Sequence, residues 1–201
     1  MMDINLILSS ALYFLALINP TSKIFLLSTM HPPFLKRELI TISIRSTIVA
    51  AIILVVLAAT GNYILVTVFK VNLYSLKVAG GIVLFIVGLT AVRKGRFYEE
   101  SEMKHVSDIS VVPLAAPLIA GTGTITAAIS YSSIHGVLLT IVCILISLGV
   151  NLSLMLVSSR IGRALEKINA SGPLIRITGL IVTAVAVQMI FSGFTEWMNQ
   201  I

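Results

Sequence analysis

The stretch Ile18-Asn19-Pro20-Thr21-Ser22-Lys23 interrupts the first apolar run of the chain, which extends from Leu6 to Met30. This run is long enough to cross a bilayer as a helix, which takes about 20 residues. Proline removes a backbone donor from a helix, and the polar neighbours and the lysine are costly in hydrocarbon. The stretch therefore predicts a broken membrane helix at a functional site.

The composition of the whole chain indicates an all-α integral membrane protein. Of its 201 residues, 57% are hydrophobic and only 11% are charged, whereas soluble domains are roughly 25% charged. Apolar runs of spanning length lie near residues 6–30, 40–60, 76–93, 111–131, 137–157 and 174–194. We predict six transmembrane helices in a single membrane domain covering residues 1–201. The single Cys143 excludes an internal disulfide framework.

Lysine and arginine gather on one side of the predicted membrane. The ends on the side of the N-terminus carry only Lys70 and Lys77. The opposite ends carry Lys36, Arg37, Arg45, Arg93, Lys94, Arg96, Lys104, Arg160, Arg163, Lys167 and Arg176. We expect the protein in the cytoplasmic (inner) membrane. Because basic loops stay in the cytoplasm, the loops near 31–39, 94–110 and 158–173 should be cytoplasmic, and both termini should face the outside. The net charge of +6 then reflects topology, and no nucleic-acid partner is expected.

The two halves of the chain repeat one another in order. Residues 77–83 match 176–182 at an offset of 99, and residues 17–21 match 118–122 at an offset of 101. We predict one repeat at about 1–93, a linker at about 94–110 and a second repeat at about 111–201. With three helices each, the repeats have inverted topology, and interrupted segments at corresponding positions then mark a binding site. The first and fourth helices are the ones predicted to be broken.

The predicted site lies where these two broken helices meet near the middle of the membrane. The candidate substrate-binding residues are Asn19, Pro20, Thr21, Ser22, Ala120, Gly121, Thr122, Gly123 and Thr124. Helix N-termini near 21–22 and 123–124 attract a carboxylate. Carbonyls near 18–19 and 119–120 are left for an ammonium group or for a coupling Na⁺, and coupling to H⁺ remains equally open.

Three further polar residues, Lys23, Asn151 and Gln188, are candidates for lining the site. Lys23 could attract a carboxylate or exchange a proton, but we expect it to snorkel to the nearby cytoplasmic end. Asn151 shares a face with Ser147 and either bonds a neighbouring helix or lines the site. The Gln188 amide either forms hydrogen bonds with the backbone groups of a broken helix or contacts the substrate. The second helix is expected to end at residues 61–62.

Other classes of function receive little support from the residues. The predicted spans contain no Asp or Glu, and His31, His105 and His135 lie at loop edges without metal-ligand spacing. No nucleophile and base can be placed at a common depth. We therefore expect no enzyme, no metal site and no cofactor other than a coupling ion.

Four stretches together resemble the MarC family of membrane proteins: ALINPTSKIF (16–25), LKVAGGIVLF (76–85), VVPLAAPLIAGTGTIT (111–126) and ITGLIVTAVAVQMIFSG (177–193). The resemblance covers nearly all of the chain. It implies six spans in a plasma membrane, arranged as two inverted three-helix repeats. It further implies transport of small neutral amino acids such as glycine and alanine.

The chain departs from the family pattern at both breaks. The family continues Asn-Pro with Ile or Phe, then Gly and a later Pro, where this chain has Thr21-Ser22-Lys23. The family's Gly-Pro-Gly is replaced by Gly121-Thr122-Gly123. The leading hypothesis is a secondary transporter of glycine, alanine or serine that works by alternating access, with its oligomeric state open. The alternatives are an efflux or channel-like pore for another small metabolite and a non-transporting membrane scaffold.

Overall fold

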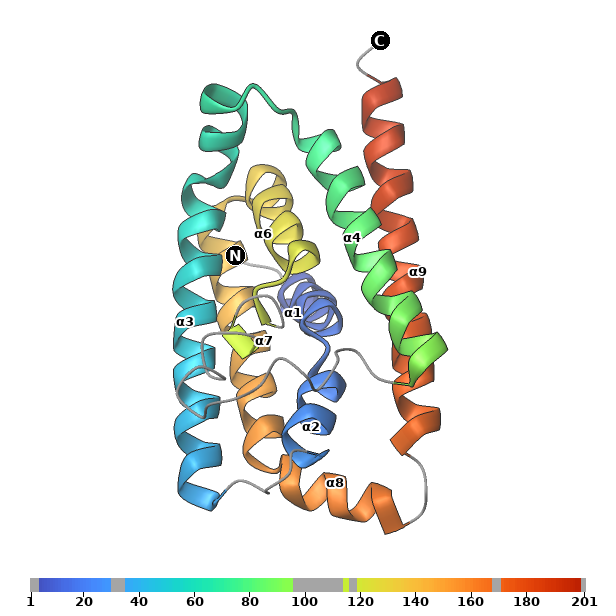
Figure 1. Cartoon of the computed structure of the whole chain (residues 1–201). Helices are drawn as coiled ribbons and strands as arrows, with labels where there is room; N and C mark the ends of the chain where they lie inside the picture. The colour runs from blue at the N-terminus through green and yellow to red at the C-terminus, as the bar shows by residue number, and fades with distance from the viewer. Residues whose placement is uncertain (1–3, 30–34, 96–113, 116–118, 168–170, 200–201) are drawn as a thin grey trace.

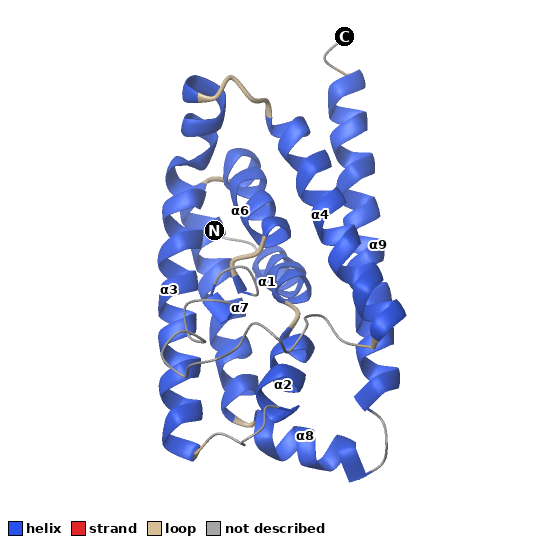
Figure 2. Ribbon diagram, in the orientation of Figure 1, coloured by secondary structure: helices blue, strands red, loops and turns tan. Residues whose placement is uncertain are grey.

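Every regular element in the described part of the chain is a helix. The computed structural model describes residues 4–29, 35–95, 114–115, 119–167 and 171–199. No strand occurs within these ranges, and the long helices run side by side in one bundle (Figures 1 and 2). The all-α class is thereby confirmed.

Four helices of the described part are long and apolar enough to cross a membrane. They are α3 (Lys36–Tyr63), which continues as the π-helix η1 (Ile64–Val68), α4 (Leu73–Lys94), α7 (Val137–Leu156) and α9 (Ser171–Met198). They match the runs predicted at 40–60, 76–93, 137–157 and 174–194. Many of their large apolar side chains are exposed, Ile52 and Leu138 among them, as expected for surfaces that face lipid.

The two remaining predicted spans consist of shorter pieces. The first comprises α1 (Ile4–Ile18) and α2 (Pro20–Thr29), and the fourth contains α6 (Thr122–His135). None of the three is long enough to cross a bilayer alone. Residues 111–113 and 116–118 of the fourth span and residues 96–110 of the linker lie outside the described residues. Six spans and the inverted repeat therefore remain predictions.

Two expected boundaries are wrong. Gly61 and Asn62 do not end the second span, because α3 runs through them to Tyr63 and then continues as η1. A Cβ on Gly61 would lie 2.6 Å from Cγ1 of Ile129, so this glycine permits close packing of α3 on α6. Residues 158–167, expected to be a loop, form α8 (Ser158–Lys167), which lies across one end of the bundle and contacts α2 (Figure 1).

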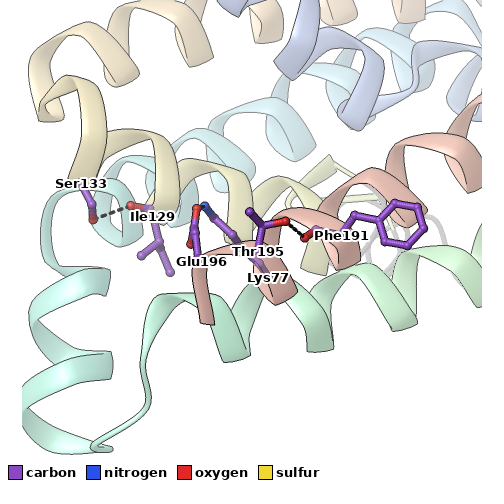
Figure 3. Close-up of polar contacts among 6 residues, drawn as sticks. All are labelled: Lys77, Ile129, Ser133, Phe191, Thr195 and Glu196. Atoms are coloured by element: carbon purple, nitrogen blue, oxygen red, sulfur yellow. Dashed lines mark hydrogen bonds and ion pairs between the residues drawn. The ribbon is translucent and has the colours of Figure 1, made fainter. Parts of the chain in front are cut away.

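Helices α4 and α9 form the most extensive pair among the described helices. Their backbones approach closely at glycine: a Cβ on Gly88 would lie 2.9 Å from the carbonyl oxygen of Gly179, and one on Gly81 would lie 2.9 Å from that of Ala186. Small residues permit such contact between membrane helices. An ion pair between Lys77, near the start of α4, and Glu196, near the end of α9, joins the other end of the pair (Figure 3).

Helix α1 is held by both α7 and α6. Ser147 Oγ donates a hydrogen bond to the carbonyl oxygen of Ala11 at 2.7 Å. The expectation that the face shared by Ser147 and Asn151 bonds a neighbouring helix is thus confirmed for Ser147, whereas the Asn151 amide donates to Met155 of its own helix. Tyr131 of α6 bonds the hydroxyl of Ser10, and its ring meets that of Phe14 edge-on at a centroid distance of 5.6 Å. These contacts hold α1 beside α6 and α7.

Candidate functional site

The first helix is interrupted at Asn19, between α1 and α2. Asn19 has φ of 55°, in the left-handed region that asparagine tolerates better than most residues. Its N–H still donates to the carbonyl oxygen of Leu15 at 2.9 Å, so α1 is hydrogen-bonded up to the break. Pro20 then occupies the first position of α2, where its fixed φ is favourable and its missing N–H costs nothing. A local Asn-Pro pair thus accounts for the interruption.

The carbonyl groups at this break are occupied by side chains of α2. Lys23 Nζ donates to the carbonyl oxygen of Ile18 and, at 3.3 Å, to that of Asn19. Ser22 Oγ donates to the same Asn19 oxygen at 2.8 Å. Lys23 is only 1% exposed, so the expectation that it snorkels toward the cytoplasmic end is wrong. Helical side chains lean toward the N-terminus of their helix, and for Lys23 that direction leads back to the break.

The second interruption lies at the start of α6. Gly121 is the N-cap, with φ of −82° and ψ of 171°, and it has no side chain that could cap the helix. The carbonyl oxygen of Gly121 accepts the first helical bond, from Ile125 N–H at 2.9 Å. The N–H groups of the first helical turn have no intrahelical acceptor and carry the positive end of the helix dipole. This end of α6 therefore favours an anionic group.

One pocket of about 150 Å³ brings the two breaks together. Its polar lining comes from Asn19, Ser22 and Lys23 at the first break and from 121–124 at the second. The remaining lining is apolar: Leu17 and Ile18 of α1, Val83, Leu84 and Val87 of α4, and Val182 of α9. Thr122 and Val83 are exposed, which places this side of the pocket near the surface. Residues about a hundred positions apart in the chain thus share one small cavity.

The pocket includes some of the predicted site residues and leaves out others. Asn19, Ser22, Gly121, Thr122, Gly123, Thr124 and Lys23 line it, whereas Pro20, Thr21, Ala120, Asn151 and Gln188 do not. Pro20 shapes the break without contributing to the lining, and Ala120 is buried. Asn151 is fully buried and donates from Nδ2 to Met155 Sδ of its own helix at 3.2 Å, while Gln188 is exposed. The role of each residue in binding remains a prediction.

Asn19 contributes an acceptor that has no partner among the described residues. The residue is 6% exposed and its Oδ1 atom makes no hydrogen bond. A buried polar atom without a partner is costly, by about 1–3 kcal/mol. Asn19 lines the pocket, so a ligand whose N–H donor reaches Oδ1 would satisfy this atom and recover that cost.

The apolar wall formed by α4 was missed by sequence reasoning. A Cβ on Gly123 would lie 2.8 Å from Cδ2 of Leu84, so the absence of a side chain at Gly123 makes room for Leu84. Leucine and valine in a membrane helix usually face lipid or core, and nothing distinguishes these positions in the sequence. Gly81 and Gly88, seven residues apart, indicate from the sequence that α4 packs closely against another helix, but they do not show which of its residues face the pocket.

Known proteins resemble this chain along nearly its full length. A family model described as MarC family integral membrane protein matches residues 4–198. A UPF0056 membrane protein of Pyrococcus horikoshii is 37% identical, over 93% of this chain and 92% of that protein. Another, of Methanocaldococcus jannaschii, is 34% identical over 96% and 97%, and one of Bacillus subtilis is 28% identical over 89% of each chain. No solved structure gives a significant match.

The stretches that carry the resemblance in the sequence, among them residues 16–25 and 177–193, lie inside the matched region. The long apolar helices of the described part agree with a protein that crosses the membrane several times. The chain therefore belongs to the MarC family of integral membrane proteins.

Proposed function

We propose that this protein is a secondary transporter that moves a small neutral amino acid, of the glycine, alanine or serine type, across the cytoplasmic membrane. The observation that carries the proposal is the pocket shared by the two helix breaks, lined by Asn19 on one side and by 121–124 on the other. Interrupted helices that meet in a membrane protein expose backbone groups which bind small charged solutes.

The size of the pocket restricts its ligand to a very small molecule. Its volume is about 150 Å³, whereas sites for drug-sized ligands occupy roughly 300–1,000 Å³. A pocket of this volume suits a solute much smaller than a drug-sized ligand. Leu84, lying against Gly123, limits the space for a side chain on that solute. Glycine and alanine suit this volume better than any large amino acid.

The charge of the pocket suits a carboxylate together with a hydrogen-bond donor. The start of α6 presents backbone N–H groups at the positive end of its dipole, and the Lys23 ammonium lies on the same pocket. The Oδ1 atom of Asn19 needs a donor, which the amino group of the substrate supplies. This assignment revises the expected one, because the carbonyl oxygens of Ile18 and Asn19 already accept hydrogen bonds from Lys23 and Ser22.

The helices around the pocket are arranged in a way that supports alternating access. The α4–α9 pair supplies the apolar wall, and the broken helices supply the polar wall. Close glycine contacts make α4 and α9 a tightly packed unit, and movement of one unit against another around a fixed site is the usual mode of such transporters. Substrate would then be exposed to each side in turn.

We propose that the end of the bundle at which α3 begins and α4 ends faces the cytoplasm. This end carries Lys36 and Arg37 at the start of α3 and Arg93 and Lys94 at the end of α4, with α8 and its exposed Arg160 across it (Figure 1). Retention of basic ends in the cytoplasm supports this orientation. Both termini would then face outside.

Uptake of labelled glycine into proteoliposomes containing the purified protein tests the proposal. We expect saturable uptake that unlabelled alanine and serine inhibit and that leucine and glutamate do not. Ser153→Ala serves as the control variant, since Ser153 is exposed on α7 and bonds only to its own helix in the described part. It should transport like the wild type.

The same experiment separates the proposal from its alternatives. Flux that neither saturates nor responds to competitors would support a channel-like pore. Absence of both uptake and stabilisation by any small amino acid would refute the proposal, and a scaffold role would then be favoured. A scaffold further predicts that Asn19→Leu combined with Gly121→Ala leaves the cell phenotype unchanged.

A further inference from the structure

The Nζ atom of Lys23 lies at the carbonyl groups that end the first half of the broken helix. The last carbonyl groups of a helix have no intrahelical donors and carry the negative end of the dipole. In membrane transporters with broken helices, such carbonyl groups coordinate Na⁺. At this break, Lys23 Nζ donates to the carbonyl oxygens of Ile18 and Asn19, and Ser22 Oγ adds a second donor to Asn19.

The surroundings of Lys23 hold the ammonium at this position. Its side chain is 1% exposed and starts from the first turn of α2, one turn after the carbonyl groups it contacts. The left-handed conformation of Asn19 turns the chain here, and Pro20 fixes the start of α2. A lysine elsewhere on α2 would not reach both oxygens, because helical side chains lean toward the preceding turn.

We propose that Lys23 is a built-in cation that takes the place of a coupling Na⁺ at the first helix break. Transport by this chain is then independent of Na⁺ at this site, and the carbonyl groups become a monovalent-cation site when the lysine is shortened. The inference deepens the proposed function, and it is tested in two experiments. The transport experiment (the transport arm) rests on the proposed function, whereas the thermal-stability experiment (the stability arm) does not.

The stability arm measures the melting temperature of purified protein in sodium chloride and in an equal concentration of N-methylglucamine chloride. The wild type should melt at the same temperature in both. Lys23→Ala should melt at a lower temperature in N-methylglucamine and recover by about 3 °C or more in sodium, because a bound ion stabilises the folded state. Lys23→Met removes the charge but fills the space, so it should be destabilised without recovery. Lys36→Ala, at an exposed lysine, should show no sodium effect.

The transport arm compares initial rates of glycine uptake with sodium and with choline outside the proteoliposomes. Equal rates are expected for the wild type, and a several-fold stimulation by sodium is expected for Lys23→Ala. A sodium requirement or sodium stabilisation of the wild type would overturn the inference, even if Lys23→Ala failed to fold. So would a folded Lys23→Ala protein that is indifferent to sodium.

The two arms distinguish failure of the inference from failure of the proposed function. If no amino acid is taken up but sodium stabilises Lys23→Ala alone, the proposed substrate is wrong and the cation role stands. If glycine uptake is saturable and the wild type needs sodium, the proposed function stands and the role given to Lys23 is wrong.

Discussion

The side chain of Leu84 lies against Gly123, so that a Cβ at position 123 would be 2.8 Å from Cδ2 of Leu84. Both residues line the pocket between the helix breaks, and their contact sets how much room remains for a ligand. Gly123→Ala should displace Leu84 into the pocket and reduce the affinity for glycine about tenfold, which corresponds to ~1.4 kcal/mol. Titration of glycine into the purified variant measures the effect.

The opposite substitution, Leu84→Ala, should enlarge the same pocket. We expect the variant to accept amino acids with longer side chains, such as valine, that inhibit the wild type poorly. Competition against labelled glycine uptake measures this change in specificity. An unchanged inhibition profile in both variants would mean that this contact does not set substrate size.

Asn19 has two separable roles, one in its backbone and one in its carboxamide. Its φ of 55° is costly for leucine, by about 1–2 kcal/mol, but not for glycine. Asn19→Leu should therefore lower the melting temperature, whereas Asn19→Gly should not. Both variants lose the Oδ1 acceptor and should bind glycine more weakly. If a stable Asn19→Gly protein bound glycine with normal affinity, the Asn19 carboxamide would have no role in binding.

The glycine contact between α4 and α9 should be intolerant of added atoms. A Cβ on Gly88 would lie 2.9 Å from Gly179 O, a backbone atom that cannot move alone. We expect Gly88→Ala to destabilise the protein by about 1–3 kcal/mol. Gly149→Ala is the matched control, because a Cβ there meets nothing within 4 Å in the described part. It should be neutral or slightly stabilising. Equal melting temperatures of the two variants would contradict the packing described.

The ion pair of Lys77 with Glu196 should contribute little to stability. The Glu196 side chain is 39% exposed, which screens the pair, although Lys77 is only 10% exposed. Exposed pairs are typically worth about 0–1 kcal/mol. Glu196→Gln should thus lower the melting temperature only slightly. Exchange of the charges, with Lys77→Glu and Glu196→Lys together, should restore most of that loss. A large loss that exchange does not repair would indicate another role for Glu196.

The position of the first break could be predicted from the sequence because its causes are local. Asparagine tolerates the left-handed region, and proline favours the first position of the next helix. The four long helices were predictable for a similar reason, since an apolar run of spanning length has few alternatives. Gly121 could be located from the prolines and glycines of the fourth apolar run and from its alignment with the first break.

The details of the site depend on tertiary packing and could not be predicted. The predicted direction of the Lys23 side chain was wrong, because the prediction considered only the distance to the membrane surface. It did not consider that side chains on a helix lean toward the N-terminus of that helix. Leu84, Val87 and Val182 carry no polar group that would distinguish them from lipid-facing residues. Gln188 was selected because it is a polar residue near the middle of its predicted span. The packing of α9 leaves it exposed, and an almost uniformly apolar helix gives little sign in its sequence of which face packs inward.

The most direct test of the central claim, that a small amino acid binds between the two breaks, is protection of a cysteine placed in the pocket. Thr122→Cys in a Cys143→Ala background puts a reactive thiol on the pocket lining, since Thr122 is exposed there and Cys143 is the single native cysteine. Ser133→Cys, exposed on the same helix but outside the pocket, is the control. The measurement is the rate of alkylation by a small maleimide with and without glycine. The account predicts that glycine slows the reaction at position 122 several-fold and leaves position 133 unchanged. Equal rates at position 122 with and without saturating glycine would contradict it.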